Sequence, residues 1–479
     1  MNFRDLIDLA SERLGGSVLY ATDDYFAEKE NLLKPSKAVW KEHEYTDRGK
    51  WMDGWESRRK RVPGHDFALI RLGARGVVRG VVVDTAFFRG NYPDSCSIEA
   101  TSMRIDASAE ELLAAMWHPI LPQSKLQGDS ENLFAIDSAV AVTHLRFNIF
   151  PDGGVARLRV HGTIVPEWRL SGGLANELDL AAVEHGADVL ACSDMFFGPK
   201  HNLIMPGRAH NMSDGWETRR RRGSGNDWVV VKLATEGRVR RIELDTNHFK
   251  GNYPDTASID GSRDGETWTE LLPRTKLQAH TRHFFMDELM SDGPFTHLRL
   301  NVFPDGGVSR MRVWGTATER GRHDAIVERV NALFDTSELR RVCGSQRWAD
   351  AVTAARPFAS WDALVDTANR VWSSLEPNDW LEAFAAHPRI GERKAGWSSN
   401  EQSGTRTASD DTMRALAETQ AAYEQKFGFL YLVCATGRTA DEMLANAHER
   451  MHNDRDTELR VAAEEQRKIT ALRLERLVL

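Results

Sequence analysis

The segment THLRFNIFPDGG, residues 143–154, returns almost unchanged as THLRLNVFPDGG, residues 296–307. Two other blocks precede each copy in the same order: residues 51–61 return as 211–222, and residues 84–94 return as 245–255. Three blocks repeated in one order indicate a tandem duplication covering about 20–165 and 190–316. The architecture of the first two thirds of the chain is therefore that of two related units.

The residues around these blocks have the pattern of short β-strands. Residues 67–72 and 77–83 are apolar or β-branched, and residues 155–161 alternate with period two, as half-buried strands do. Pro-Asp-Gly-Gly turns separate the strands in both copies. Many short strands without regular helices between them predict a sandwich or jelly roll for each repeat.

The pattern changes after Gly315. Residues 316–323 are polar and predict a linker, and residues 324–479 are rich in Ala, Leu, Glu and Arg, as helices are. One helix is expected to start at a Ser409 cap and to end at Gly428. Its predicted apolar face holds Met413, Leu416, Ala417, Tyr423 and Phe427. The prediction is two all-β repeats, 1–178 and 179–318, followed by an all-α domain, 319–479.

Composition excludes several classes of partner. The net charge is −8 and no segment is strongly basic, which argues against nucleic acid and anionic membranes. The four cysteines are far apart and form neither a zinc motif nor a disulfide framework. No apolar run is long enough for a signal peptide or a membrane helix. We expect a cytoplasmic homo-oligomer that acts on small molecules.

The three repeated blocks, with residues 22–27, 193–199 and 206–208, resemble the allantoicase family over about residues 15–320. The resemblance implies two jelly-roll repeats and the cleavage of allantoate into ureidoglycolate and urea. Arginine forks suit the carboxylate of such a substrate, and carboxylates suit its ureido groups. Candidate site residues are Glu56, Arg58, Glu217 and Arg219, beside an aromatic wall, with His144 and His297 as acid–base groups and His248, which replaces Phe87 of the first copy.

Alternatives to this site remain open at the level of sequence. Glu and Arg in one run also pair across sandwiches for structural reasons, and one repeat alone could be catalytic. The repeats could instead be ligand-binding jelly rolls without hydrolase activity; exposed aromatics would favour that reading, and a buried Glu/Arg/His cluster would favour catalysis. No clustered Asp/His metal motif is present, so a divalent metal for the allantoicase stays unknown. The Asp-Gly-Gly turns offer oxygen ligands but are more often plain hairpin turns.

In the C-terminal region, His387 stands at the predicted end of a helix, before Pro388, where the helix dipole favours an imidazolium. That helix, residues 380–386, is predicted to be capped by Asn378. The last helix carries Arg473 on an apolar stripe with Leu459, Ala462, Gln466, Ile469 and Leu477, and a buried arginine needs an anion or a backbone acceptor. Each residue alone could equally be a cap or a structural tie.

Together, His387-Pro388 and residues 356–360, 398–402, 426–429 and 468–474 resemble the OHCU decarboxylase family, over about 325–479. That family converts 2-oxo-4-hydroxy-4-carboxy-5-ureidoimidazoline (OHCU) to (S)-allantoin. The resemblance implies His387 and Glu401 as catalytic residues. The substrate-binding residues it implies are Pro388, Ser398, Ser399, Asn400, Gln402, Tyr431, Leu432, Val433, Cys434, Ala435 and Arg473. The sequence departs from the family at Leu430-Tyr431, where Pro-Phe is expected, but it keeps an apolar strand there.

The two resemblances predict a bifunctional enzyme of urate breakdown. The decarboxylase needs no cofactor, because the ring imine of its substrate can accept the electrons that carbon dioxide leaves behind. The ring-opening step between allantoin and allantoate has no visible domain in the sequence. Direct channelling from one site to the other is therefore not expected.

Overall fold

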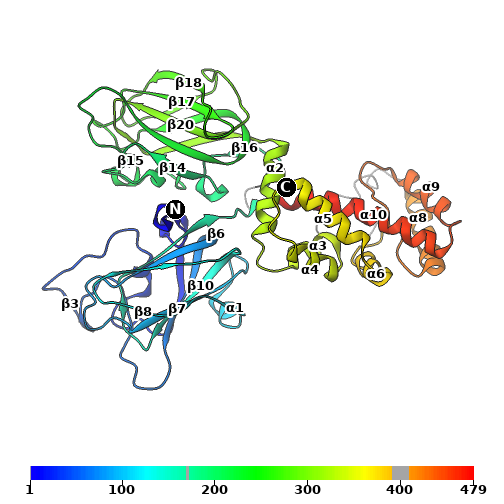
Figure 1. Ribbon diagram of the computed structural model, residues 1–479, viewed down its shortest axis with the longest axis horizontal. Helices are drawn as coiled ribbons and strands as arrows, with labels where there is room; N and C mark the ends of the chain where they lie inside the picture. Colours follow the sequence, from blue (N-terminus) through cyan, green and yellow to red (C-terminus); the bar gives the residue numbers. More distant parts are fainter. Residues whose placement is uncertain (1, 169–171, 391–408) are drawn as a thin grey trace. The chain divides into compact units, whose positions relative to one another are not determined.

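A computed structural model describes residues 2–168, 172–390 and 409–479. The chain divides into two compact units, Met1–Ala325 and Ile326–Leu479. Figure 1 shows that the first unit is built of strands and the second of helices. The predicted order of two β repeats followed by a helical domain is confirmed. In the described residues, no helix is long and apolar enough to cross a membrane.

The first repeat forms an antiparallel sheet in the order β1-β12-β6-β10-β7-β8, and β2 and β9 also pair with β6. Its elements are β1 (Ile7–Asp8), β2 (Ser17–Ala21), β3 (Tyr45–Thr46), β4 (Gly49–Lys50), β5 (Trp55–Glu56), β6 (Asp66–Asp84), β7 (Ser95–Thr101), α1 (Ala109–Leu113), β8 (His118–Lys125), β9 (Glu131–Ala135), β10 (Ala141–Phe150), β11 (Gly154–Val155) and β12 (Arg157–Ile164). Two-stranded ribbons β11-β5 and β3-β4 stand beside the main sheet.

The second repeat has the same order, β13-β22-β16-β20-β17-β18, with β14 and β19 on β16 and a β15-β21 ribbon. Its strands are β13 (Leu178–Asp179), β14 (Asp188–Cys192), β15 (Trp216–Glu217), β16 (Asp227–Asp245), β17 (Thr256–Ser262), β18 (Thr269–Lys276), β19 (Arg282–Phe285), β20 (Phe295–Phe303), β21 (Gly307–Val308) and β22 (Arg310–Ala317). The duplicated sequence thus folds into duplicated topology.

One prediction about the strands is wrong in detail. Residues 67–72 and 77–83 belong to a single strand, β6, which has 19 residues. Its first half pairs with β2 and β10, and its second half pairs with β9 and β12. The Gly-rich stretch between the halves is not a turn. It lets one strand change partners and so link the two layers of the sandwich.

The helices after the repeats are α2 (Glu319–Asn331), which begins in the first unit, and then α3 (Ser337–Cys343), α4 (Gln346–Ala354), α5 (Trp361–Ser373), α6 (Pro377–Ala385), α8 (Asp410–Phe427), α9 (Ala440–Arg450), α10 (Arg455–Glu475) and the 3₁₀ turn η9 (Arg476–Val478). The predicted polar linker is wrong: residues 316–317 end β22 and residues 319–323 begin α2. Thr318 starts this helix by bonding the Glu236 carboxylate and the Gly321 N–H. The prediction failed because the exposed first turns of a helix can be as polar in composition as a linker.

Helix α8 begins and ends as expected, with the Ser409 hydroxyl accepting from the Thr412 N–H and Gly428 in the left-handed region. Its buried face differs from the prediction because Ala417 is exposed and Gln420 is buried. Helix α6 is capped by Glu376 with Asp379 in a capping box, rather than by Asn378. His387 follows α6 directly, and its N–H donates to the Phe384 carbonyl at 3.1 Å.

Candidate functional sites

The three repeated blocks meet at one point in each β repeat. Glu56 lies on β5 and pairs with Gly154 of β11. Asn91, from the second block, donates its side-chain amide to Glu56 Oε1 at 2.7 Å, and its carbonyl accepts the Gly154 N–H at 2.7 Å. Asn91 therefore joins the first block to the third, and the Glu56 carboxylate stands where all three converge.

The glycines of the Pro-Asp-Gly-Gly turn allow this convergence. Gly153 has a φ of +137°, and a Cβ there would stand 2.8 Å from the Asn91 carbonyl oxygen. A Cβ on Gly154 would collide with the ring of Phe88. The third block thus needs two glycines because the Asn91 loop packs directly against its backbone.

The second repeat builds the same arrangement from Glu217, Asn252 and Gly307. The Asn252 amide donates to Glu217, its carbonyl accepts the Gly307 N–H at 2.8 Å, and Gly307 pairs with Glu217. Both glutamates were predicted from the sequence, but the two asparagines were not. Their signal was present, since Gly-Asn-Tyr-Pro-Asp recurs in both copies.

Burial raises the pKa of the Glu56 carboxyl above its ordinary value, and the hydrogen bond from Asn91 opposes that shift. A carboxyl group with a raised pKa can hold a proton nearer to neutral pH and then donate it. Glu56 therefore combines partial burial, one fixed hydrogen-bond donor and a perturbed pKa.

The predicted arginine partners do not pair with these glutamates. Arg58 binds the Asp23 carboxylate, with its Nε 2.7 Å from Oδ2, and Arg219 binds Asp194 in the same way at 3.2 Å. Both guanidinium groups are largely exposed. Sequence proximity placed Arg58 beside Glu56, but β5 ends at Glu56, and beyond it both the backbone N–H and the guanidinium of Arg58 bind the Asp23 carboxylate.

The predicted aromatic wall is also different. Trp55 and Trp216 are fully buried, and their indole N–H groups donate to the carbonyls of Asp23 and Asp194 at 2.8 and 2.9 Å. These tryptophans belong to the cores of the repeats. Side chains alternate along a strand, so the tryptophan next to each partly exposed glutamate points into the core.

Exposed aromatic side chains lie on the chain segments that precede Glu56 in the first repeat, and the Phe26 N–H donates to the Glu56 carbonyl at 3.2 Å. The chain between Ala27 and Asp53 is longer than its counterpart in the second repeat and carries the β3-β4 hairpin. In it, Trp40 packs on Phe87 with ring centroids 5.8 Å apart, and the Lys50 ammonium lies 4.8 Å from the Trp40 ring. Neighbouring Tyr25, Phe26 and Tyr45 are exposed. The second repeat has no equivalent hairpin among its described residues.

The histidines on the main strands lie away from the glutamates. His144 is near the start of β10, whereas the Glu56 contact follows the end of that strand, about 20 Å further along six residues. His144 is buried, its Nδ1 is 2.9 Å from Thr143 Oγ1, and burial lowers its pKa to about 4. His297 of the second repeat contacts Thr296 in the same way, and burial also lowers its pKa.

His248 and Phe87 occupy equivalent positions with φ values of +71° and +69°. The His248 N–H donates to His280 Nδ1 at 2.8 Å, where Phe87 instead donates to the Asp129 carboxylate. His248 Nε2 lies 3.0 Å from the Ala209 carbonyl. The two copies thus share a backbone bend and differ in the side chains that hold it.

The described residues contain no group of three or more His, Cys, Asp or Glu side chains that could hold a metal ion. The turn carboxylates are engaged in hydrogen bonds to the backbone: Asp152 accepts the Lys60 N–H and Asp305 accepts the Arg221 N–H, both at 2.7 Å. Within the described ranges, the Asp-Gly-Gly segments therefore act as hairpin turns.

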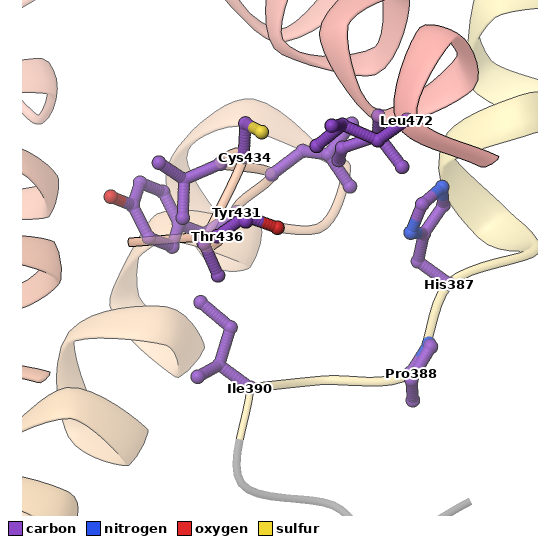
Figure 2. Close-up of a pocket in the computed structure, with 11 residues that line it drawn as sticks. His387, Pro388, Ile390, Tyr431, Cys434, Thr436 and Leu472 are labelled. Atoms are coloured by element: carbon purple, nitrogen blue, oxygen red, sulfur yellow. The ribbon is translucent and has the colours of Figure 1, made fainter. Parts of the chain in front are cut away.

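The helical unit contains a cavity beside His387. Figure 2 shows His387, Pro388 and Ile390 along one segment, facing Tyr431, Cys434 and Thr436. Among the described residues, its lining is His387, Pro388, Ile390, Tyr431, Leu432, Val433, Cys434, Ala435, Thr436, Ile469 and Leu472. Every predicted residue between 431 and 435 lines it, whereas Ile390, Thr436, Ile469 and Leu472 were not predicted as site residues. The segment 431–435 is extended but forms no strand.

Arg473 reaches the cavity through His387. The two side chains are buried, and Arg473 Nη2 lies 3.4 Å from His387 Nδ1. An arginine can only donate, so this contact makes Nδ1 the acceptor and leaves the ring proton on Nε2. Arg473 also contacts the Val342 carbonyl at 3.4 Å. The arginine that the apolar stripe predicted to point inward therefore contacts the predicted catalytic histidine.

The backbone of the 431–436 segment, which faces His387 across the cavity, is held by polar side chains that do not line the cavity. Arg450 donates to the Leu432 carbonyl at 2.7 Å and pairs with the buried Glu458. Glu465 accepts the Cys434 N–H at 2.7 Å. The Tyr431 hydroxyl donates to Asn446 and contacts the Met443 carbonyl, and burial raises its pKa to about 12. The substitution at position 431 therefore adds a hydroxyl with partners outside the cavity lining.

Five predicted residues of this site, Ser398, Ser399, Asn400, Glu401 and Gln402, lie outside the described residues. Their place beside His387 stays a prediction.

Comparison with known proteins gives the following matches. The family described as allantoicase repeat matches residues 7–165 and 178–318, and the OHCU decarboxylase family matches residues 331–475. A probable allantoicase of Pseudomonas fluorescens (strain SBW25) is 51% identical over 328 residues, covering 66% of this chain and 98% of the relative. The crystal structure of allantoicase from Saccharomyces cerevisiae is 34% identical, with a TM-score of 0.56, over 64% of this chain and 92% of that chain. A crystal structure of OHCU decarboxylase in the presence of (S)-allantoin is 40% identical, with a TM-score of 0.28, over 29% of this chain and 96% of that chain.

Proposed function

Since the chain belongs to the allantoicase family and ends in an OHCU decarboxylase domain, we propose that it catalyses two reactions of purine breakdown. The β repeats hydrolyse allantoate to (S)-ureidoglycolate and urea, and the helical domain decarboxylates OHCU to (S)-allantoin. The functional boundaries are those expected from the sequence, 1–178, 179–318 and 319–479. The observation that carries the proposal is the match of both families in tandem over described, folded units.

We place the hydrolysis of allantoate at the Glu56–Asn91 pair. Water adds its oxygen to the central carbon, the bond from that carbon to one ureido nitrogen breaks, and the leaving nitrogen takes a proton. A partly buried Glu56 with a raised pKa is suited to donate that proton. Asn91 holds the carboxyl in place.

We assign the reaction to the first repeat. Among the described residues, this repeat alone has the β3-β4 hairpin, whose Lys50 lies over Trp40, which packs on Phe87 in the block that also holds Asn91. Such a cation is suited to bind the carboxylate of allantoate. In the second repeat, Glu217 has the same asparagine partner without the hairpin. His144 and His297, which lie on the main strands, are structural residues in this proposal.

For OHCU, loss of carbon dioxide leaves its electron pair on the substrate, where the ring imine accepts it, and a proton must then arrive on one face. His387, with its proton on Nε2, supplies or relays that proton, and Arg473 holds the ring in this tautomer. Glu401 and residues 398–402 complete the site by the family resemblance. No cofactor takes part in this step.

The direct test is to assay the purified chain for urea release from allantoate and for (S)-allantoin formation from OHCU, each with and without a chelator. We expect both activities, and decarboxylation should be unaffected by the chelator because the imine is the electron sink. A loss of urea release that added divalent ion restores would assign a metal to the allantoicase. A folded chain that lacks either activity, even with added divalent ions, would contradict that half of the proposal.

Glu56→Gln and Glu217→Gln test the assignment to the first repeat. Glutamine keeps the shape and the bond to asparagine but cannot donate an acidic proton. We expect Glu56→Gln to lower kcat for urea release by about 10²-fold or more and Glu217→Gln to lower it much less. The reverse order would move the site to the second repeat, and two fully active variants would place it elsewhere.

A further inference from the structure

Two side chains of α8 hold the chain segment that follows His387-Pro388. The Gln420 Oε1 accepts the Ile390 N–H at 2.9 Å, and its Nε2 donates to the Ile390 carbonyl at 3.2 Å. One turn further along the helix, Glu424 accepts two hydrogen bonds from the Arg389 guanidinium, each 2.8 Å long. Residues 389 and 390 are thus fastened to one face of α8.

The contacts of Gln420 differ in strength from those of Glu424. Gln420 is only 3% exposed, so an Ile390 N–H or carbonyl that lost this amide would stay poorly solvated. The Arg389–Glu424 pair is more exposed and is therefore screened by water. Gln420 is the stronger of the two attachments.

Ile390 is itself part of the cavity lining, two residues beyond Pro388 and three beyond His387. The short segment between His387, whose N–H is bonded to the Phe384 carbonyl of α6, and Ile390 has little freedom because both of its ends are held. The position of His387 against the 431–436 wall therefore depends on the amide of Gln420.

We propose that Gln420 is a positioning residue of the decarboxylase site. It does not line the cavity; it acts through Ile390, and it keeps His387 and Ile390 aimed at the same substrate face. The proposal rests on the decarboxylase function proposed above. Its consequence is stereochemical. A single enantiomer forms only when the site fixes the face of the substrate that receives the proton, and protonation of either face gives racemic allantoin.

The test uses Gln420→Met in the full chain, since methionine has a similar length and makes neither hydrogen bond. We expect kcat for decarboxylation to fall about 10-fold or more, because small misplacements of reacting groups are costly. We also expect the enantiomeric excess of (S)-allantoin, corrected for spontaneous reaction, to fall. A variant with wild-type kcat and pure (S)-allantoin would overturn the proposal.

Gln466→Met is the matched control. Gln466 is a fully buried glutamine of the same unit, on α10, and its amide donates to the Cys343 carbonyl and to Thr470, each at 3.1 Å. Its two hydrogen bonds go to neither Ile390 nor a residue of the cavity lining, so this variant should lose stability while keeping its enantiomeric excess. An equal loss of enantiomeric excess in Gln466→Met would reduce Gln420 to an ordinary core residue and overturn the inference.

Glu424→Gln keeps the inference testable if Gln420→Met does not fold. It weakens the partly exposed pair with Arg389 and should lower kcat two- to threefold, with a smaller loss of enantiomeric excess. Unchanged kinetics in this variant, with Gln420→Met unfolded, would count against the inference. A wild-type chain that forms no more (S)-allantoin than the buffer would instead overturn the proposed decarboxylase function, which separates the two failures.

Discussion

Two residues of the first β repeat show how burial changes the pKa of a side chain. Glu56 and His144 lie in the same repeat, and burial disfavours the charged form of both. For Glu56 this produces a carboxyl that retains its proton more readily, which is useful to an acid. For His144, the same effect lowers the pKa and favours the neutral ring at neutral pH, which agrees with the structural role proposed for it above.

The pKa of His144 predicts a pH-dependent stability. Its folded pKa of about 4 lies below the ordinary 6.5, so the unfolded chain binds the proton more tightly. Stability is therefore full above about pH 6.5 and falls as the pH drops toward 4, by up to about 3 kcal/mol. Urea unfolding of the β unit at pH 7.0, 5.5 and 4.5 measures this slope.

His144→Gln should flatten that slope, because glutamine does not titrate. The exposed His43 offers a control, and His43→Gln should leave the slope unchanged. If His144→Gln and the wild type lost stability equally between pH 7.0 and 4.5, another group would have to carry the effect.

At the scale of elements, a buried ion pair ties the first block to the strand after the third. Arg157 on β12 reaches the Asp53 carboxylate at 2.8 Å and also donates to the Asp53 and Ser36 carbonyls. Arg310 and Asp214 repeat this pair in the second copy at 3.2 Å. The pairs hold the β5 and β15 segments, and with them the two glutamates, against the main sheets.

Asp53→Ala should be strongly destabilising. It leaves the buried Arg157 guanidinium without its carboxylate, a change that typically costs about 3–5 kcal/mol. Thermal unfolding of the β unit, followed by circular dichroism, measures the loss. Glu44→Ala, which removes an exposed pair with Lys41, should cost less than about 1 kcal/mol. Equal effects of the two substitutions would show that the buried pair contributes no more than a surface one.

At the scale of the whole molecule, the two proposed reactions use residues of separate compact units. Glu56 and Asn91 lie in Met1–Ala325, and His387 and Arg473 lie in Ile326–Leu479. Between the two proposed reactions the ring of allantoin must be hydrolysed to give allantoate, a step that belongs to neither of the two matched families.

His387→Ala should therefore separate the activities in the full chain. Formation of (S)-allantoin should fall by about 10²-fold or more, the usual scale for removing a positioned acid–base group, while urea release stays at its wild-type rate. Both rates are measured on one preparation. Glu56→Gln is the reciprocal control and should spare decarboxylation. Loss of urea release in His387→Ala would contradict the independence of the two units.

The sequence by itself determined the duplication, the β and helical regions and the identity of most candidate residues. Repeated blocks, alternation and helix caps are local patterns, and His387 at the end of α6 follows from the proline after it. Even the approach of Arg473 to His387 could be expected in part, because an arginine on an apolar stripe must turn inward to a partner.

Only the tertiary structure decided which of these residues meet. Glu56 is two residues from Arg58 in sequence, yet its partner is Asn91, because the distant Asp23 carboxylate binds Arg58 while the Gly153-Gly154 turn brings the Asn91 loop to Glu56. The long strand β6 and the role of Gln420 were invisible for the same reason. A strand's length depends on the partners that pair with it, and a buried glutamine is explained only by the backbone groups it satisfies.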